Sequence, residues 1–319
     1  MFIAYFSAES ATKSCISEPE DATLKFAPAI FFALVVGAMS SARAAPVVFS
    51  APVLGVPGIQ ATVDAFRLAL GAANPNVAGS FGTGRREITW DGVRDPQAAP
   101  NNLPANFFNI NSPRGVVLST PGSGFQVSAN SGVAPIEFGN INATYSGLFQ
   151  TFSAQRLFTA LDSNITDVNF FVPGSATAAT VSAFGAVFTD VDLANSTSLQ
   201  FFDLGNVSLG EFFVPVGTSI TGNESLSFLG VRFDAGKRVG RVRITSGNAA
   251  LGGNDGGGID LVVMDDFIYA EPTASVPEPA TLLLVGPLLA ALWILRRRRL
   301  RYGQQEDSLR RLRKVTSRW

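Results

Sequence analysis

Carboxylates are the side chains of this sequence best suited to chemistry, since it contains no histidine and its only cysteine is Cys15. This composition excludes Ser-His-Asp and Cys-His nucleophiles and zinc sites built from His or Cys. A bound metal ion would need oxygen ligands, which calcium prefers. An enzyme would have to act through carboxylates, as glycosidases do. The central region has few glutamates, so a glycoside hydrolase is the least favoured function and we expect a non-enzymatic protein.

Asp265 and Asp266 are adjacent acids within the apolar run 261–269. That run predicts a β-strand, in which successive side chains point to opposite faces. One of the two carboxylates would then face the interior or the rim of a sheet, where an unpaired charge is costly. A metal ion, backbone amides or an arginine could each offset that cost, and the sequence leaves the choice open.

Trp90 lies among charged residues that include Arg85, Arg86 and Asp91. Its indole could stack on a sugar ring while Arg85 and Asp91 hydrogen-bond to the sugar, which would make a ligand site. Tryptophan in a strand is also a common core residue, so a structural role is the alternative.

Short apolar runs separated by Gly, Pro, Asn and Asp must position these side chains, and they predict an all-β fold. The 26 phenylalanines suit the core of an antiparallel β-sandwich. We predict one short helix over 60–71. The predicted strands are 87–90, 115–119, 124–128, 168–172, 180–184, 186–188, 198–202 and 261–269.

Two hairpins are predicted from their turn residues. The first spans 199–214 and turns at Asp203-Leu204-Gly205-Asn206, where Gly and Asn tolerate positive φ. The second spans 226–245 and turns at Asp234-Ala235-Gly236. We assign the β-sandwich domain to residues 85–270, preceded by a separate segment, 45–84.

Charge is divided unevenly along the chain. Residues 45–276 hold 11 Lys and Arg against 18 Asp and Glu, a net charge of −7, whereas residues 278–319 hold 10 against 3, a net charge of +7. An acidic body argues against nucleic acid as a partner, because phosphate binding needs cations. A basic end after an apolar segment is expected to stay in the cytoplasm.

Residues 1–44 have the parts of a secretory signal peptide: Lys25, the apolar run 26–39, and Ala42-Arg43-Ala44 as a cleavage sequence. The predicted cleavage follows Ala44, with Ala42 and Ala44 as its small residues. Four acids precede Lys25, which does not suit a cationic leader, so we expect translation to start near Leu24. The alternative is a buried helix of the folded domain.

The C-terminal region combines a proline-rich linker (271–279), an apolar segment that leads into an arginine cluster (280–299) and a basic tail (300–319). The order of Val276-Pro277-Glu278-Pro279, the apolar run and Arg296-Arg297-Arg298-Arg299 resembles the PEP-CTERM sorting signal of exported bacterial proteins. The resemblance implies an exosortase as partner, cleavage near Pro277-Glu278-Pro279 and a membrane stop at the four arginines.

As a helix, 280–295 would span about 24 Å against a hydrocarbon core of ~30 Å, which suits a transient transmembrane helix. A retained anchor is the alternative. The tail is a departure, because the family's signal usually ends soon after its arginines.

The body resembles jelly-roll β-sandwiches of the carbohydrate-binding type through an Ala-Phe-Gly strand (183–185), a Phe-Leu-Gly-Val strand (228–231) and a closing Asp-Asp-Phe strand (265–267). Such modules place a final-strand aspartate on a structural calcium ion, which implies calcium at Asp266 with oxygens from Asp190, Asp192 or Glu87. Asn254, Asp255 and Asp260, in or beside a Gly/Asn/Asp-rich loop, could also ligate calcium or simply form turns.

These observations together predict an exported protein that passes through the inner membrane to the cell surface or extracellular matrix. We expect it to associate with exopolysaccharide in a biofilm. A calcium-dependent carbohydrate-binding module is the alternative.

Overall fold

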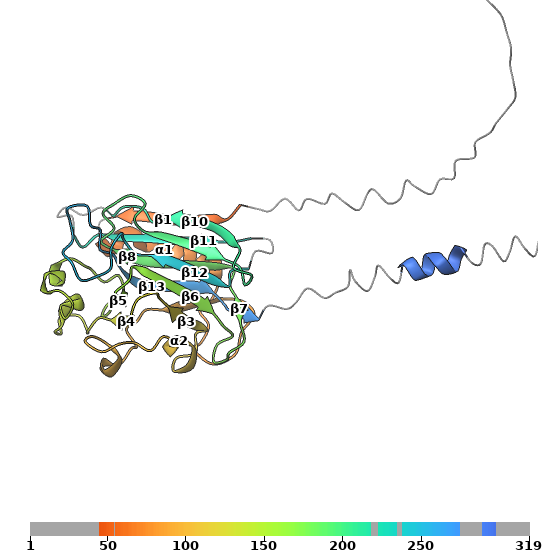
Figure 1. The fold of residues 1–319 in the computed structure, drawn as a ribbon, viewed down its shortest axis with the longest axis horizontal. Helices are drawn as coiled ribbons and strands as arrows, with labels where there is room; N and C mark the ends of the chain where they lie inside the picture. Colours follow the sequence, from red (N-terminus) through yellow and green to blue (C-terminus); the bar gives the residue numbers. More distant parts are fainter. Residues whose placement is uncertain (1–44, 54, 218–222, 235–237, 275–288, 298–319) are drawn as a thin grey trace, which may run out of the picture. The chain divides into compact units, whose positions relative to one another are not determined.

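The computed structural model describes residues 45–53, 55–217, 223–234, 238–274 and 289–297. Within these residues the protein is mostly β-sheet, with every paired strand antiparallel. Two large sheets pack on each other (Figure 1). The predicted all-β class is confirmed, and the arrangement is consistent with a sandwich.

The larger sheet has seven strands in the order β1-β11-β8-β13-β5-β4, with β2 also paired to β13. Its strands are β1 (Val47–Val53), β2 (Arg85–Ile88), β4 (Gly124–Val127), β5 (Phe158–Leu161), β8 (Ala183–Thr189), β11 (Leu226–Arg232) and β13 (Val263–Ala270). The central strands β8, β11 and β13 are almost wholly buried, because the sheet is covered on both faces.

The smaller sheet has five strands in the order β10-β9-β12-β6-β3. They are β3 (Val116–Ser119), β6 (Ile165–Phe170), β9 (Ser198–Phe202), β10 (Ser208–Phe213) and β12 (Arg241–Thr245). Strand β12 alternates, with Val242 and Ile244 buried in the core and Arg241 and Arg243 on the opposite face. A two-stranded pair, β7 (Ala179–Thr180) and β14 (Thr273–Ala274), lies outside both sheets.

Helices are few among the described residues. The longest is α1 (Gly55–Leu70); α2 (Phe107–Ile110) and the 3₁₀ turns η1 (Asp95–Gln97), η2 (Ile136–Phe138) and η3 (Ala143–Gly147) are short. The predicted helix 60–71 is thus present, but it begins five residues earlier at Gly55. Pro57 is compatible with this start because proline is tolerated in a first helical turn.

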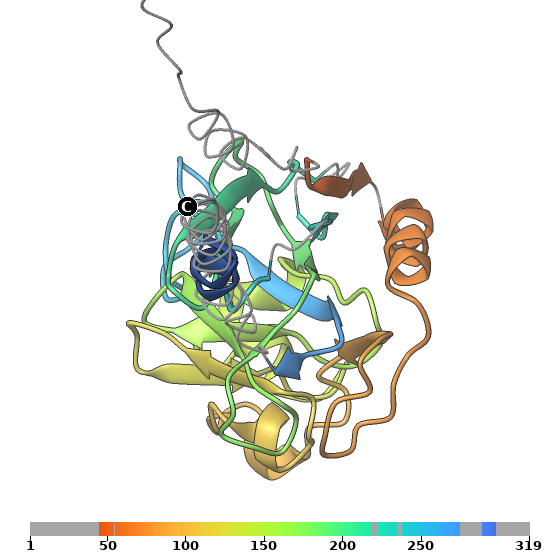
Figure 2. The same cartoon turned by 90° about the vertical axis from the view of Figure 1, so that its right-hand side faces the viewer.

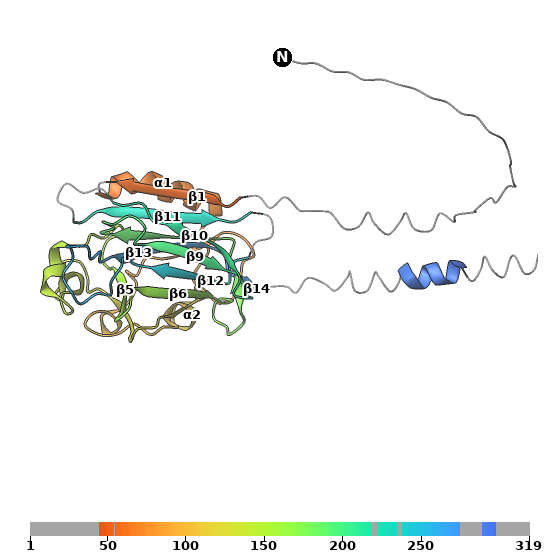
Figure 3. The same ribbon diagram turned by 45° about the horizontal axis from the view of Figure 1, so that its top comes forward.

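Helix α1 covers the outer face of the larger sheet, over β1 and β11 (Figures 2 and 3). Phe66 inserts above Gly185 and Gly230, which are direct partners on β8 and β11. A Cβ at either glycine would come within 2.9 Å of the Phe66 ring. The missing side chains at the two glycines therefore leave room for the Phe66 ring of the helix. This explains why glycine occupies these positions in strands that otherwise carry bulky residues. Strand β1 and helix α1, both in the predicted N-terminal segment 45–84, therefore pack with the larger sheet, which extends beyond the predicted bounds 85–270.

The two predicted hairpins have different outcomes. Strands β9 and β10 pair as expected, with Ser198 opposite Phe213 at one end and Phe202 opposite Ser208 at the other. Strands β11 and β12 do not pair, because β11 joins β1 and β8 in the larger sheet while β12 joins β6 and β9 in the smaller one. The chain between them crosses from one sheet to the other, so the second hairpin is wrong.

Most of the predicted sorting residues lie outside the described part of the chain. This holds for Ala42 and Ala44, for 276–279, and for Arg298 and Arg299. Arg296 and Arg297 lie within the helical residues 289–297, where the Arg297 guanidinium lies 4.0 Å from the centre of the Trp293 ring. Among the described residues, none of the helices combines the length and the apolar character required to cross a bilayer.

Candidate functional site

Trp90 lies in the core between the sheets and is 1% exposed. Its ring stacks on Phe158 with the centroids 4.1 Å apart, and its indole N–H donates to the Asp265 carbonyl at 2.8 Å. A sugar could not reach this ring, so the predicted stacking platform is wrong. The polar neighbours predicted for it are occupied as well, because Arg85 donates to Glu87 at 2.6 Å and Asp91 accepts from the Arg156 amide at 3.3 Å.

Strand β13 carries a bulge at its two aspartates. Met264 pairs with Phe188 and Phe267 with Ala186, so β13 has one more residue than β8 between these points. Asp265 and Asp266 both reach the Ser153 hydroxyl, at 3.2 Å and 2.7 Å. The expectation that they face opposite sides is therefore wrong, since the extra residue interrupts the alternation.

Asp265 anchors the chain segment that precedes β5. Its carboxylate accepts hydrogen bonds from the amides of Phe152 at 2.6 Å and Ser153 at 3.2 Å. Burial, together with the neighbouring Asp266, raises the pKa of Asp265 well above its ordinary value. This residue thus has the amide-capping role that was one alternative for the pair.

Asp266 and Glu87 share one arginine of helix α1. The Arg67 guanidinium donates to Glu87 at 2.8 Å and to Asp266 at 3.1 Å. Burial alone would raise the pKa of Glu87, but hydrogen bonds from Arg67 and Arg85 outweigh it and hold that pKa below its usual range. A calcium ion at Asp266 with Glu87 would have to compete with this cation, so the structure gives these two acids an ion-pair role instead.

Replacing Arg67 by methionine should destabilise the sandwich by about 1–3 kcal/mol, because the buried Asp266 loses its cation. The loss should be smaller than for a fully buried pair, since the Arg67 side chain is 21% exposed. Urea unfolding monitored by circular dichroism would measure it. Arg94→Met, at an exposed arginine, is the matched control and should change the free energy of unfolding by less than about 0.5 kcal/mol. A loss equal to that of the control would refute the ion-pair role.

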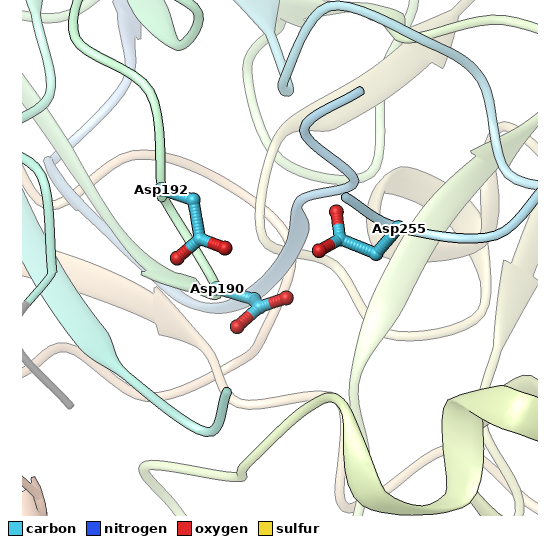
Figure 4. A group of neighbouring side chains, drawn as sticks. All are labelled: Asp190, Asp192 and Asp255. Atoms are coloured by element: carbon cyan, nitrogen blue, oxygen red, sulfur yellow. The ribbon is translucent and has the colours of Figure 1, made fainter. Parts of the chain in front are cut away.

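A second acidic cluster lies beyond the end of β8. Asp190 and Asp192 follow this strand, and Asp255 belongs to the glycine-rich loop (residues 250–258) that precedes β13. One carboxylate oxygen from each lies within 4.8 Å of the other two. Figure 4 shows the Asp255 carboxylate directed toward the other two. Asp190 and Asp192 are therefore neighbours of Asp255 rather than of Asp266.

Asp190 is the most constrained member of this acidic cluster. It has no exposed surface, its φ is 70°, and neither of its carboxylate oxygens has a hydrogen-bond donor among the described residues. The nearby Glu224 amide donates instead to the Leu148 carbonyl at 2.9 Å and offsets only a small part of the cost of burial. Burial and the surrounding carboxylates raise the pKa of Asp190 to about 9, and the same two causes raise the pKa of Asp192 to about 6.

Asp260 joins the two chain segments that supply the acidic cluster, the one after β8 and the one before β13. Its carboxylate accepts from the amides of Asp192 at 3.0 Å and Leu193 at 3.3 Å, and from the Ser196 hydroxyl. Gly247 makes this approach possible, because a Cβ there would lie 2.0 Å from the Asp260 carbonyl oxygen. Asp260 thus positions the other acids, with its own oxygens already in use.

The glycine-rich loop is fixed by a buried tyrosine as well. The Tyr145 hydroxyl donates to the Gly253 carbonyl at 2.8 Å and accepts from the Gly252 amide at 2.7 Å. Asp255 accepts from the Leu261 amide at 3.0 Å. The loop therefore holds Asp255 in a defined position, which its turn-rich sequence did not indicate.

The acidic cluster offers hard oxygen ligands without a nucleophile or a nitrogen base, which suits cation binding better than catalysis. No known family model matches this chain, and no curated protein sequence matches it. Functional conclusions therefore rest on the residues and their geometry.

Proposed function

We propose that this chain is an exported, non-enzymatic protein of the bacterial surface or extracellular matrix, sorted through its C-terminal region. The observation that carries the proposal is the order of Pro277-Glu278-Pro279, an apolar segment and four arginines, which resembles the PEP-CTERM signal. An exosortase would cleave near Val276–Pro279 while the inner membrane holds the apolar segment. The released body would associate with exopolysaccharide.

A jelly-roll body suits this role, and the strand order supports it. In a jelly roll, one sheet holds strands one, eight, three and six, and the other holds two, seven, four and five. Taken in chain order from β5 and omitting the short β7, the described strands give β5-β13-β8-β11 and β6-β12-β9-β10. Strands β1, β3 and β4 would then extend the edges of this arrangement.

Intact-mass analysis of the cell-surface form, from cells with and without the exosortase, tests the sorting proposal. We expect a product that starts at Ala45 and ends near Pro277-Glu278-Pro279, and a product that keeps its C-terminal region when the exosortase is deleted. Glu278→Gln should reduce processing, whereas Glu306→Gln, an equal charge change in the tail, should not. A full-length protein in the cytosolic fraction of both strains would contradict the proposal.

A calcium-dependent carbohydrate-binding module is the second candidate, and the arginine-bearing face of the smaller sheet, partly exposed among the described residues, favours it. Arg241 and Arg243 lie on this face and share Asp167, at 2.7 Å and 2.8 Å. The Arg241 guanidinium lies 3.9 Å from the centre of the Phe202 ring. Arg243 is 41% exposed and binds Asp167 through two of its three nitrogens, so the third could hydrogen-bond a glycan. Glycan-array binding that is lost in EGTA would select this function over the first.

A further inference from the structure

The cost of burying the Asp190 carboxylate is left almost uncompensated by the described residues, since only the nearby Glu224 amide offsets a small part of it. The two oxygens of Asp190 accept no hydrogen bond in the described part of the chain, and the charges that act on it come from other acids, without a lysine or arginine. A bare carboxylate in a protein interior is strongly disfavoured, so buried charges are normally paired or coordinate a metal. Two further carboxylates converge on the same point (Figure 4). The placement brings together like charges that would repel one another unless a cation lay between them.

We infer that Asp190, Asp192 and Asp255 bind one calcium ion that ties the chain beyond β8 to the glycine-rich loop. The three side chains provide only oxygen ligands, which calcium prefers to the nitrogen and sulfur ligands of zinc. They come from two loops, whose backbone carbonyls could supply further oxygens, and calcium accepts such irregular shells of 6–8 ligands. Magnesium is less suited, because it requires near-octahedral geometry and retains its water.

The inferred ion would connect two segments that are distant in sequence, the chain after β8 and the glycine-rich loop. Asp260 already joins them through the amides of Asp192 and Leu193, so the protein backbone is arranged before the cation binds. Extracellular calcium modules work with dissociation constants of about 10⁻⁴–10⁻³ M. An affinity in that range would leave the site empty in the cytoplasm and filled outside the cell. The inference rests on the geometry alone and holds whichever route the protein takes.

Calcium titration of the purified full-length chain, first stripped with EGTA, tests this inference. Isothermal titration calorimetry should give one site with a dissociation constant of about 10⁻⁴–10⁻³ M, and magnesium should bind at least roughly tenfold more weakly. Calcium should raise the melting temperature, and the rise should grow with the logarithm of calcium concentration once this exceeds the dissociation constant. It should also slow amide hydrogen exchange in residues 250–258.

Asp190→Asn and Asp255→Asn separate calcium binding from folding. Each should weaken calcium binding by roughly tenfold or more. In EGTA, Asp190→Asn should melt no lower than the parent, because the amide has nearly the same shape and stays neutral in these acidic surroundings. Asp203→Asn removes the same charge from a half-exposed turn and should bind calcium like the parent. An unchanged melting temperature at 10 mM calcium (about ten times the weakest expected dissociation constant), equal binding by magnesium, or parental affinity in both variants would overturn the inference.

Discussion

Arg86→Met is expected to destabilise the sandwich by about 3–5 kcal/mol, the usual cost of removing one partner from a buried ion pair. The Arg86 side chain has no exposed surface and binds both oxygens of Glu271, at 2.8 Å and 2.9 Å. Its remaining N–H groups donate to the carbonyls of Val77, Gly79 and Pro113. Methionine has a similar length but can make none of these bonds.

Glu271 would then be a buried carboxylate held only by weaker donors. These are the Asn74 side-chain amide at 2.9 Å and the Phe81 backbone amide at 3.2 Å. The Arg86–Glu271 pair ties β2 to the residue that follows β13, and Arg86 also binds the chain before β2 through Val77 and Gly79, so its loss should loosen the point where the sandwich continues into the proline-rich linker. Two-state urea unfolding would give the change in free energy.

A double variant provides the internal control for Arg86. Adding Glu271→Gln to Arg86→Met removes the orphaned charge and should recover part of the lost stability. Arg94→Met, at an exposed arginine, should remain within about 0.5 kcal/mol of the parent. If Arg86→Met costs no more than Arg94→Met, the pair does not hold this edge of the fold together.

Trp90→Ala is expected to lower the free energy of unfolding by about 3–5 kcal/mol, because it leaves a cavity among the aromatic side chains of the core. Trp90 stacks on Phe158 and meets Phe108 and Phe267 edge-on, with centroids 5.3 Å and 5.0 Å away. Trp90→Phe should keep most of this packing and lose chiefly the hydrogen bond to the Asp265 carbonyl, at about 1–2 kcal/mol. Thermal and urea unfolding followed by far-ultraviolet circular dichroism would measure both.

Phe213→Ala is the matched control for Trp90, since that ring is 49% exposed on β10 and should cost under about 1 kcal/mol. The same variants separate a core role from a ligand role. A sugar platform would lose glycan binding in Trp90→Phe at almost unchanged stability, whereas a core residue loses stability. Parental stability in Trp90→Ala would contradict the core role.

Secondary structure was predictable where its cause is local. The strand 198–202 was predicted with its observed bounds, and the turn at 203–206 joins it to β10 as expected. The second hairpin prediction was based on Asp234-Ala235-Gly236, yet the strands on either side of it entered different sheets, and Ala235 and Gly236 lie outside the described residues. A turn sequence favours a reversal of direction, but the burial of both faces of β11 decides which strands it pairs with.

The acidic residues, too, were predictable in their type of chemistry but not in which of them lie together. Composition alone directed attention to oxygen chemistry, and Asp190 and Asp192 were among the residues expected to serve it. Their grouping with Asp266 and Glu87 was wrong, because those two acids share Arg67. For Asp255 the sequence left calcium binding and a simple turn both open, since nothing within a few residues of it indicates that Tyr145 and Asp260 hold the surrounding chain in place.

The sequence by itself determined the properties that depend on neighbouring residues: the β-rich alternation, the acidic body with a basic end, and the exclusion of histidine and cysteine chemistry. Only the tertiary structure decided which side chains meet. One bulge in β13 turned two adjacent aspartates toward the same serine, and the pairing of β13 with β8, which places Val263 opposite Thr189, brought Asp255 to Asp190. Such encounters depend on strand pairing across many residues, and the local pattern of a chain carries no record of them.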